Sequence, residues 1–323
     1  MELLEANHKN ILKAAKFIKE GNLVAFPTET VYGLGADGLN PLAVAKIFEA
    51  KKRPAFNPLI LHITNLKQFE MISGSGNPSI KKLIDNFWPG PLTLVLPKKD
   101  IVPDIVTAGN ETVAIRMPDH PTALELIDMV GNPIAAPSAN TFGHLSPTTA
   151  QHVVNQLGSK VDLVLDGGTC RVGIESTIIA ILENRVILLR PGGTATEDIE
   201  KIIGPIEKDV IFSSNQPISP GQLPYHYAPK IPIRFMHKID DENIDPGRAG
   251  LLLFTDKKVD YRFKITKVLT HNSDLREAAA NLFSYLHEME STGIDIIYVE
   301  PVREVGLGIA IMDRLRKATN KYE

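Results

Sequence analysis

The sequence of 323 residues predicts an α/β protein, in which a twisted sheet of mixed strand direction precedes a smaller second α/β domain. Short apolar runs typical of strands mix with amphipathic helical patterns without strict alternation, which favours mixed strand directions. A segment with three prolines, 219–229, interrupts this pattern, and the length suits two domains of about 150 residues each. We therefore expect a first domain over 1–212, a linker over 213–231 and a second domain over 232–323.

The first domain is expected to open with an amphipathic helix over 8–20, which ends at Gly21. Asn40 and Pro41 suit the cap and first position of the next helix, which should end before Pro54. Further helical patterns occupy 65–72, 78–87, 121–130, 147–157 and 194–203. Strands are expected at 23–26, 59–63, 92–96, 113–117, 133–136, 163–165, 177–182 and 186–189.

The linker is unusual because it carries Tyr225, His226 and Tyr227, whereas an inert linker is usually small and polar. Beyond it, strand patterns alternate with long helical patterns, which favours a second domain with a parallel core. Its strands are expected at 250–254, 265–269 and 294–299, with helices over 273–290 and from 306 onwards.

Composition excludes several classes of protein. A net charge of −3 gives no broad basic field for nucleic acid. The single cysteine, Cys170, allows neither an internal disulfide nor a paired-cysteine metal site. No apolar run approaches the roughly 20 residues that a membrane span needs, and the N-terminus lacks the apolar core of a signal peptide. We therefore expect a cytoplasmic protein without a membrane partner.

Gly33 to Gly38 match the G-x-G-x-x-G pattern, but we reject a nicotinamide site there. The dinucleotide-binding fingerprint needs a helix directly after the glycines and an acidic residue at the end of the next strand. Here the next helix begins only at Pro41, and the residue near the end of the next strand is His62. No phosphate-binding P-loop, serine elbow, metal cage or paired nucleophile is evident. The chemistry is therefore expected to run by positioning and charge neutralisation, with no protein-bound metal.

Four cationic residues occupy the ends of predicted elements. Lys51 and Arg53 end a helix, where they could simply complement its dipole, although Arg53 could also fork onto phosphate oxygens. Arg116 and Arg190 end apolar strands, where ligands of open α/β sheets usually bind. The set predicts a pocket for a polyanion, and a nucleotide suits it better than a nucleic acid.

Several polar segments allow both a structural and a binding interpretation. Residues 27–34 could hold a small zwitterion, or could form a turn with local hydrogen bonds. Ser138 and Asn140 follow a run of small residues that would let a ligand approach the backbone. Ser146 suits the cap of the helix over 147–157, and a helix start there would also offer N–H groups to phosphate.

Motifs that span nearly the whole chain complete the sequence pattern. They are, in order, PTETVYGLGAD, KKRPAFNPL, FWPGPLTLVL, VAIRMPDH, APSANTFGHLSPT, DGGTCRVGIESTI, LLRPGG, SPGQLPYHYAP and GLGIAIMDRLRKAT. Together they resemble the threonylcarbamoyl-AMP synthase family, in its long, two-domain form. The resemblance implies a YrdC-like catalytic domain, of a type once described as binding double-stranded RNA, and a Rossmann-like C-terminal domain.

The resemblance also implies an activity. Such a nucleotidyltransferase would form threonylcarbamoyl-AMP and pyrophosphate from L-threonine, bicarbonate or CO₂, and ATP with Mg²⁺. The product would pass to a downstream tRNA-modifying transferase complex, for the threonylcarbamoyl modification of the adenosine next to the anticodon.

Site residues follow from the same resemblance, with Lys51 and Arg53 expected to be catalytic and the linker Tyr227 expected to close over the nucleotide. The threonine-side positions are Thr30, His62, Arg116, Ala136 and Ser176. The nucleotide-side positions are Lys51, Arg53, Asn57, Thr112, Ser138, Asn140, Ser146, Arg190 and Tyr227.

Two other functions stay open from the residues alone. An RNA-binding module without catalysis would need a broad basic surface, which the net charge of −3 does not support, although weak RNA binding at a local patch is compatible with it. A different carbamoyl or adenylyl transferase on the same scaffold would accept another amino acid. No motif assigns a role to the second domain.

Overall fold

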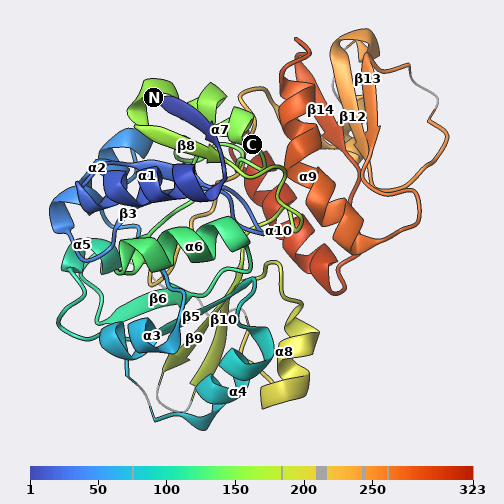
Figure 1. Ribbon diagram of the computed structural model, residues 1–323. Helices are drawn as coiled ribbons and strands as arrows, with labels where there is room; N and C mark the ends of the chain where they lie inside the picture. Colours follow the sequence, from blue (N-terminus) through green and yellow to red (C-terminus); the bar gives the residue numbers. More distant parts are fainter. Residues whose placement is uncertain (75, 183–184, 209–216, 242–244, 260–261, 323) are drawn as a thin grey trace.

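A computed structural model describes residues 1–322 apart from 75, 183–184, 209–216, 242–244 and 260–261. The expected boundary between residues 212 and 213 lies outside the described residues. Figure 1 shows two α/β bodies, with the N-terminal one in blue to yellow and the C-terminal one in orange and red.

A ten-stranded sheet with the order β1-β8-β2-β3-β7-β4-β6-β5-β9-β10 forms the centre of the first domain. The pairs β4·β6 and β5·β9 are parallel, whereas β5·β6 and β9·β10 are antiparallel, which confirms the predicted mixture of directions. The strands are β1 (Glu2–Glu5), β2 (Val24–Phe26), β3 (Gly33–Asp37), β4 (Ile60–His62), β5 (Leu92–Pro97), β6 (Thr112–Arg116), β7 (Ile134–Ala135), β8 (Leu163–Asp166), β9 (Thr177–Leu182) and β10 (Arg185–Arg190).

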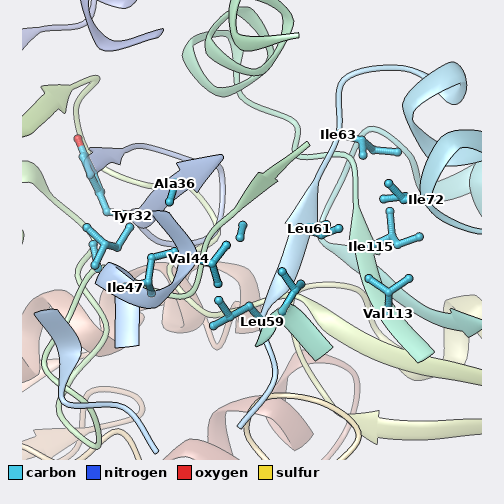
Figure 2. Close-up of a cluster of buried hydrophobic side chains, with 14 of the residues drawn as sticks. Tyr32, Ala36, Val44, Ile47, Leu59, Leu61, Ile63, Ile72, Val113 and Ile115 are labelled. Atoms are coloured by element: carbon cyan, nitrogen blue, oxygen red, sulfur yellow. The ribbon is translucent and has the colours of Figure 1, made fainter. Parts of the chain in front are cut away.

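Helices cover both faces of this sheet. On one face α1 and α6 pack over Val24 and Phe26, and on the other α2 packs over the alternate strand residues. Figure 2 shows Val44 and Ile47 of α2 beside Leu59 and Leu61 at β4. The helices are α1 (His8–Lys19), α2 (Pro41–Lys51), α3 (Leu66–Ile72), α4 (Pro78–Phe87), α5 (Asp104–Thr107), α6 (Pro121–Val130), α7 (Ala150–Leu157), η1 (Gly158–Lys160) and α8 (Thr196–Ile203).

The second domain is built on a four-stranded, wholly parallel sheet with the order β11-β14-β12-β13, which confirms the predicted parallel core. Its two long helices, α9 and α10, pack against each other and bury their apolar stripes in one core. The elements are β11 (Ile233–Phe235), η2 (Met236–Asp241), η3 (Pro246–Arg248), β12 (Ala249–Leu253), β13 (Ile265–Val268), α9 (Leu275–Glu290), β14 (Ile296–Val299) and α10 (Leu307–Thr319).

The core of the second domain also contains side chains from the first. Val31, Leu145 and Ile174 belong to loops of the first domain, yet they pack in the same cluster as α9 and α10. At Gly173 (φ +75°) a Cβ atom would lie 2.5 Å from the backbone of α9, so only glycine permits this close approach. The second domain therefore rests directly on three loops of the first, and Figure 1 shows α9 and α10 on the side turned towards it.

The structure corrects several sequence predictions. The Gly33–Asp37 segment is strand β3, which confirms that its glycines form no dinucleotide loop. The helix expected over 147–157 begins only at Ala150, and its cap is Thr149, so Ser146 is not a capping residue. Strands β1, β3 and β11 and the short α5 were not predicted, because each is brief or lacks a clear hydrophobic period. Among the described helices, none combines the length and the apolar character that crossing a bilayer requires.

Candidate functional site

One cleft of the first domain gathers residues from distant parts of the chain. Ile60 and His62 both line it, and because they are two residues apart on β4, the cleft lies over one face of the sheet. Arg116 and Arg190 reach it from the last positions of β6 and β10. The predicted site residues that line this cleft are Thr30, Arg53, His62, Arg116, Ala136, Ser138, Ser176, Arg190 and Tyr227.

Arg116 dominates the end of the cleft that was predicted to hold threonine. Its side chain is 3% exposed, with Nη1 donating to Oγ1 of Thr30 at 2.9 Å and Nε donating to the carbonyl of Gly90 at 3.2 Å. Nη2 lies 2.6 Å from Oε1 of Glu29, a fully buried carboxylate of the 27–34 segment that was expected to hold a zwitterion or form a turn. The two opposite charges compensate each other out of water.

His62 lies near Arg116 in the cleft, whereas the hydroxyl of Ser176 accepts from Nη2 of Arg190 at 3.2 Å. Burial, reinforced by the neighbouring charge of Arg116, lowers the pKa of His62 to about 3, so its imidazole is neutral at physiological pH. The hydroxyl of Ser176 lies 2.7 Å from that of Thr93, a buried residue of β5. Polar groups and the small Ala136 thus surround a compact space.

Arg53 marks the other end of the cleft, and Asn57 holds it in place. Its Nε donates to the backbone oxygen of Asn57 at 3.0 Å, and Nη2 donates to Oδ1 of the same residue at 2.7 Å and to the carbonyl of Pro58 at 2.8 Å. Burial lowers the pKa of Arg53 to about 9, so the guanidinium is still charged at neutral pH. Asn57 therefore orients Arg53 and does not itself line the cleft.

Lys51 also lies behind the cleft wall. Its Nζ donates to the backbone oxygen of Ser138 at 2.5 Å, to that of Asn140, and to Oδ1 of Asn140 at 3.3 Å. Burial, and secondarily the charge of Arg53, hold the pKa of Lys51 well below its usual range. The lysine thus fixes the segment that presents Ser138, and Lys51 itself, which was predicted to be catalytic, does not line the cleft.

Two further predicted residues lie outside the cleft lining. The hydroxyl of Ser146 donates to Oε1 of Glu175 rather than capping a helix. Thr112 opens β6, and its hydroxyl has no hydrogen-bond partner among the described residues. Of the predicted nucleotide set, the residues that line the cleft are Arg53, Ser138, Arg190 and Tyr227, and those that do not are Lys51, Asn57, Thr112, Asn140 and Ser146.

Arg190 is hydrogen-bonded to Ser176, the residue before β9, and is covered by the linker. Its Nε and Nη2 donate to the backbone oxygen of Ser176 at 3.1 and 2.9 Å. A Cβ atom at Gly221 (φ +86°) would lie 2.7 Å from Cδ of Arg190, so the linker can approach this arginine closely only with a glycine. Tyr227 lines the cleft and is 2% exposed, whereas Tyr225 is 54% exposed. The structure thus distinguishes the two linker tyrosines.

The sequence predictions missed Glu175 and Arg314. Glu175 lines the cleft, and its Oε2 accepts from Nε of Arg314 on α10 at 3.0 Å. Arg314 lies on the buried face of its helix, at helical spacing from Ile311 and Ala318. A cation within such an apolar stripe was the one sequence signal that could have pointed to a buried partner.

Comparisons with known proteins agree over both domains. Residues 16–192 match the protein family described as "Telomere recombination", and residues 194–320 match "Threonylcarbamoyl-AMP synthase, C-terminal domain". A threonylcarbamoyl-AMP synthase of Bacillus subtilis (strain 168) is 44% identical over 98% of this chain and 94% of the relative. One of Pyrococcus abyssi is 45% identical over 95% of this chain and 93% of the relative.

A solved structure also matches the fold over nearly the whole chain. The crystal structure of P. abyssi Sua5 complexed with L-threonine has a TM-score of 0.90 at 41% identity, and the match covers 99% of this chain and 98% of that one. Both domains, their order and their sheets are therefore shared with that protein. This chain belongs to the threonylcarbamoyl-AMP synthase family.

Proposed function

We propose that this protein forms threonylcarbamoyl-AMP and pyrophosphate from L-threonine, bicarbonate or CO₂, and ATP. The observation that carries the proposal is the single cleft into which Arg53, Arg116 and Arg190 all project. Relatives that bear the name of this activity match more than nine tenths of the chain, and the similar Sua5 structure holds L-threonine.

Threonine fits the end of the cleft around Arg116. A guanidinium that already contacts Thr30 and Glu29 is fixed in place and can receive the amino-acid carboxylate through charge-assisted hydrogen bonds. The hydroxyl of Ser176 and the small side chain of Ala136 offer a polar and an apolar neighbour for the branched side chain of threonine.

ATP fits the end between Arg53 and Arg190. Both guanidinium groups are buried and charged, and Ser138 adds a hydroxyl between the two walls. Because two cations flank this space, they can share the negative charge of the phosphates and stabilise the additional charge of the transition state. Tyr227 of the linker covers the same end.

The reaction requires two bond-forming steps. The unprotonated amine of threonine attacks the carbon of CO₂, and loss of one proton from the nitrogen gives an N-carboxylate. An oxygen of this carboxylate then attacks the α-phosphorus of ATP, the bond from that phosphorus to the bridging oxygen breaks, and pyrophosphate leaves with the electron pair. The role of the cleft is to align the carboxylate with the phosphorus and to neutralise charge.

A magnesium ion bound to ATP would supply further neutralisation of phosphate charge. Glu175 is a carboxylate of the described cleft lining, but Ser146 and Arg314 already occupy its two oxygens. Among the described residues there is also no cluster of three potential metal ligands. The cleft therefore suits an ion that arrives on the triphosphate and keeps several of its waters.

The linker protects the product from water. The mixed anhydride hydrolyses easily, so a closed site is needed until the product is released. Pro220, Gly221, His226 and Tyr227 of the linker all line the cleft. We propose further that the product passes, in the cytoplasm, to a transferase complex that modifies tRNA next to the anticodon, with no more than weak RNA binding by this chain.

The test is pyrophosphate release from ATP, measured with and without L-threonine and bicarbonate, with the product identified by mass spectrometry. We expect release that requires both co-substrates, and its loss in Arg53→Ala and Arg116→Ala. Arg185→Ala is the matched control, because Arg185 is an exposed arginine paired with Glu207. Wild-type rates in both cleft variants would overturn the site, and a clear preference for another amino acid would indicate a different transferase.

A further inference from the structure

The side chain of Arg314, from the second domain, lies against the cleft wall by contacting Glu175 of its lining. It is 1% exposed, and although it belongs to α10, its guanidinium contacts the first domain. Nε donates to Oε2 of Glu175 at 3.0 Å, and Nη1 donates to the carbonyl of Pro191 at 2.6 Å. These two partners sit directly beside Ser176 and Arg190 in sequence, so Arg314 bridges the start of β9 and the end of β10.

The contacts of Arg314 lie next to Arg190, the cation that we assign to the nucleotide. Arg190 is fixed by the backbone oxygen of Ser176, and Glu175, the residue before it, is close enough for its charge to act on Arg190. Both oxygens of Glu175 are engaged, one by the hydroxyl of Ser146 and the other by Arg314. Glu175 therefore forms its ion pair with Arg314 of the second domain.

The other neighbours of Arg314 do not need it in the same way. Asp313 accepts from Nη1 of Arg314 at 2.9 Å, but it also pairs with Lys317 at 2.7 Å, so its charge is compensated twice. The ring of Tyr227 lies 5.0 Å from the guanidinium carbon of Arg314 and is packed within the same core. Among the described residues, Arg314 is the cation that lies within ion-pair distance of Glu175, so this carboxylate depends on it most.

From this arrangement we propose that Arg314 is a positioning residue, which neutralises Glu175 and so keeps Arg190 available to the phosphates of ATP. Without Arg314, a buried carboxylate would remain at the cleft wall within electrostatic range of Arg190, and pairing between them would compete with the nucleotide. The second domain thus completes the nucleotide end of the site. This inference rests on the proposed function in assigning Arg190 to ATP.

The experiment measures the Kd of a non-hydrolysable ATP analogue with Mg²⁺ by calorimetry, on the full chain, and the KM values of ATP and threonine in pyrophosphate release. We expect Arg314→Gln to raise the Kd of the analogue and the KM of ATP about tenfold, the scale of one lost charge-assisted interaction, with the KM of threonine nearly unchanged. Arg314→Lys retains the cation and should recover most of the loss. Arg316→Ala, on the same helix and paired with Glu304 within the second domain, is the control.

The decisive variant is the double substitution Arg314→Gln with Glu175→Gln. Because a neutral amide cannot pair with Arg190 as an ion, we expect nucleotide affinity to return to within about threefold of wild type. A merely structural Arg314 predicts no such recovery, and equal affinities in wild type and Arg314→Gln would also overturn the proposal. Thermal unfolding shows whether Arg314→Gln folds. If it does not, Arg314→Lys is compared with the double variant Arg314→Lys, Glu175→Gln. Equal nucleotide affinities of these two variants support neutralisation of Glu175, and weaker binding by the double variant contradicts it.

The two proposals can fail separately. If the wild-type protein does not bind the ATP analogue at all, the proposed function fails. If the wild type binds the analogue but the Arg314 series behaves like the Arg316 control, only the positioning role fails.

Discussion

The two ends of the cleft are built in different ways. Arg116, Glu29 and Thr30, at the end that we assign to threonine, all belong to the first domain and contact one another directly. At the nucleotide end, Arg190 is covered by linker residue Gly221 and bordered by contacts of Arg314 from the second domain. The amino-acid end is thus preformed within one domain, whereas the nucleotide end depends on three parts of the chain.

This difference predicts that substitutions at the two ends of the cleft will affect different kinetic constants. Changes at the amino-acid end should alter threonine use and leave nucleotide binding intact. Changes in the linker or the second domain should weaken nucleotide binding and leave threonine use intact. The following predictions, ordered from the largest effect, test that separation.

Arg116→Ala should have the largest effect. Loss of the guanidinium removes the proposed carboxylate partner, so threonine-dependent pyrophosphate release should fall by at least about 100-fold. It also leaves Glu29 as an unpaired buried carboxylate, which should cost about 3–5 kcal/mol of the free energy of unfolding. Chemical denaturation measures the second effect, and calorimetry with the ATP analogue should show near-normal binding by the folded fraction. Loss of nucleotide binding in folded protein would contradict the division of the cleft.

Arg190→Ala should damage the opposite end. The KM of ATP should rise about 10- to 100-fold, as expected for a lost hydrogen bond between charged groups, while the KM of threonine changes little. Steady-state kinetics with each substrate varied in turn measures both constants. A larger effect on threonine than on ATP would show that Arg190 belongs to the amino-acid end.

Tyr227→Ala should act through closure of the linker. We expect a smaller rise in the KM of ATP, about fivefold, with a greater share of ATP lost to AMP through hydrolysis of the product. The ratio of AMP to threonylcarbamoyl-AMP, followed by chromatography, reports this leak. Tyr225→Ala is the matched control because Tyr225 is exposed. An unchanged ratio in Tyr227→Ala would show that the linker does not exclude water from the product.

The smallest predicted effect is a dependence of stability on pH at the contact between the domains. His152 of α7 stacks on His287 of α9 with ring centroids 3.9 Å apart, and Nε2 of His287 lies 3.1 Å from the backbone oxygen of Ser146. Burial lowers the pKa of His152 to about 4 and, with the charge of His152, that of His287 to about 3, both from an ordinary 6.5. The unfolded chain therefore takes up protons first as the pH falls below about 6.5, and stability should decrease from there to about pH 3.

Thermal unfolding midpoints at pH 7, 6 and 5 measure this effect. His62 is also buried and neutral, so the wild-type midpoint should fall with pH for more than one reason. His287→Gln should therefore flatten the dependence without abolishing it. Identical slopes in the wild type and the variant would show that this pair does not contribute.

The same contrast between the two ends explains what the sequence could predict. Local signals were sufficient for the two-domain α/β fold and for placing Arg116 and Arg190 at the ends of apolar strands. The other predicted residues of the cleft lining were assigned from the family resemblance. The supporting residues were harder to assign, because the roles of Asn57 and Ser146 depend on which neighbour their side chains reach after folding.

Contacts between distant segments escaped prediction for the same reason. The pair of Glu175 and Arg314 joins residues 139 positions apart, and no local period of either segment encodes it. Ser146 was misassigned as a helix cap because Ser-Pro suits a helix start, whereas the hydroxyl of Thr149 caps the helix by accepting from the N–H of His152.

The most direct test of the account is a crystal structure of the protein with L-threonine and a non-hydrolysable ATP analogue. We expect the threonine carboxylate on Arg116 and the phosphates between Arg53 and Arg190, under Tyr227. A triphosphate bound outside this cleft, or an amino acid bound away from Arg116, would contradict the account.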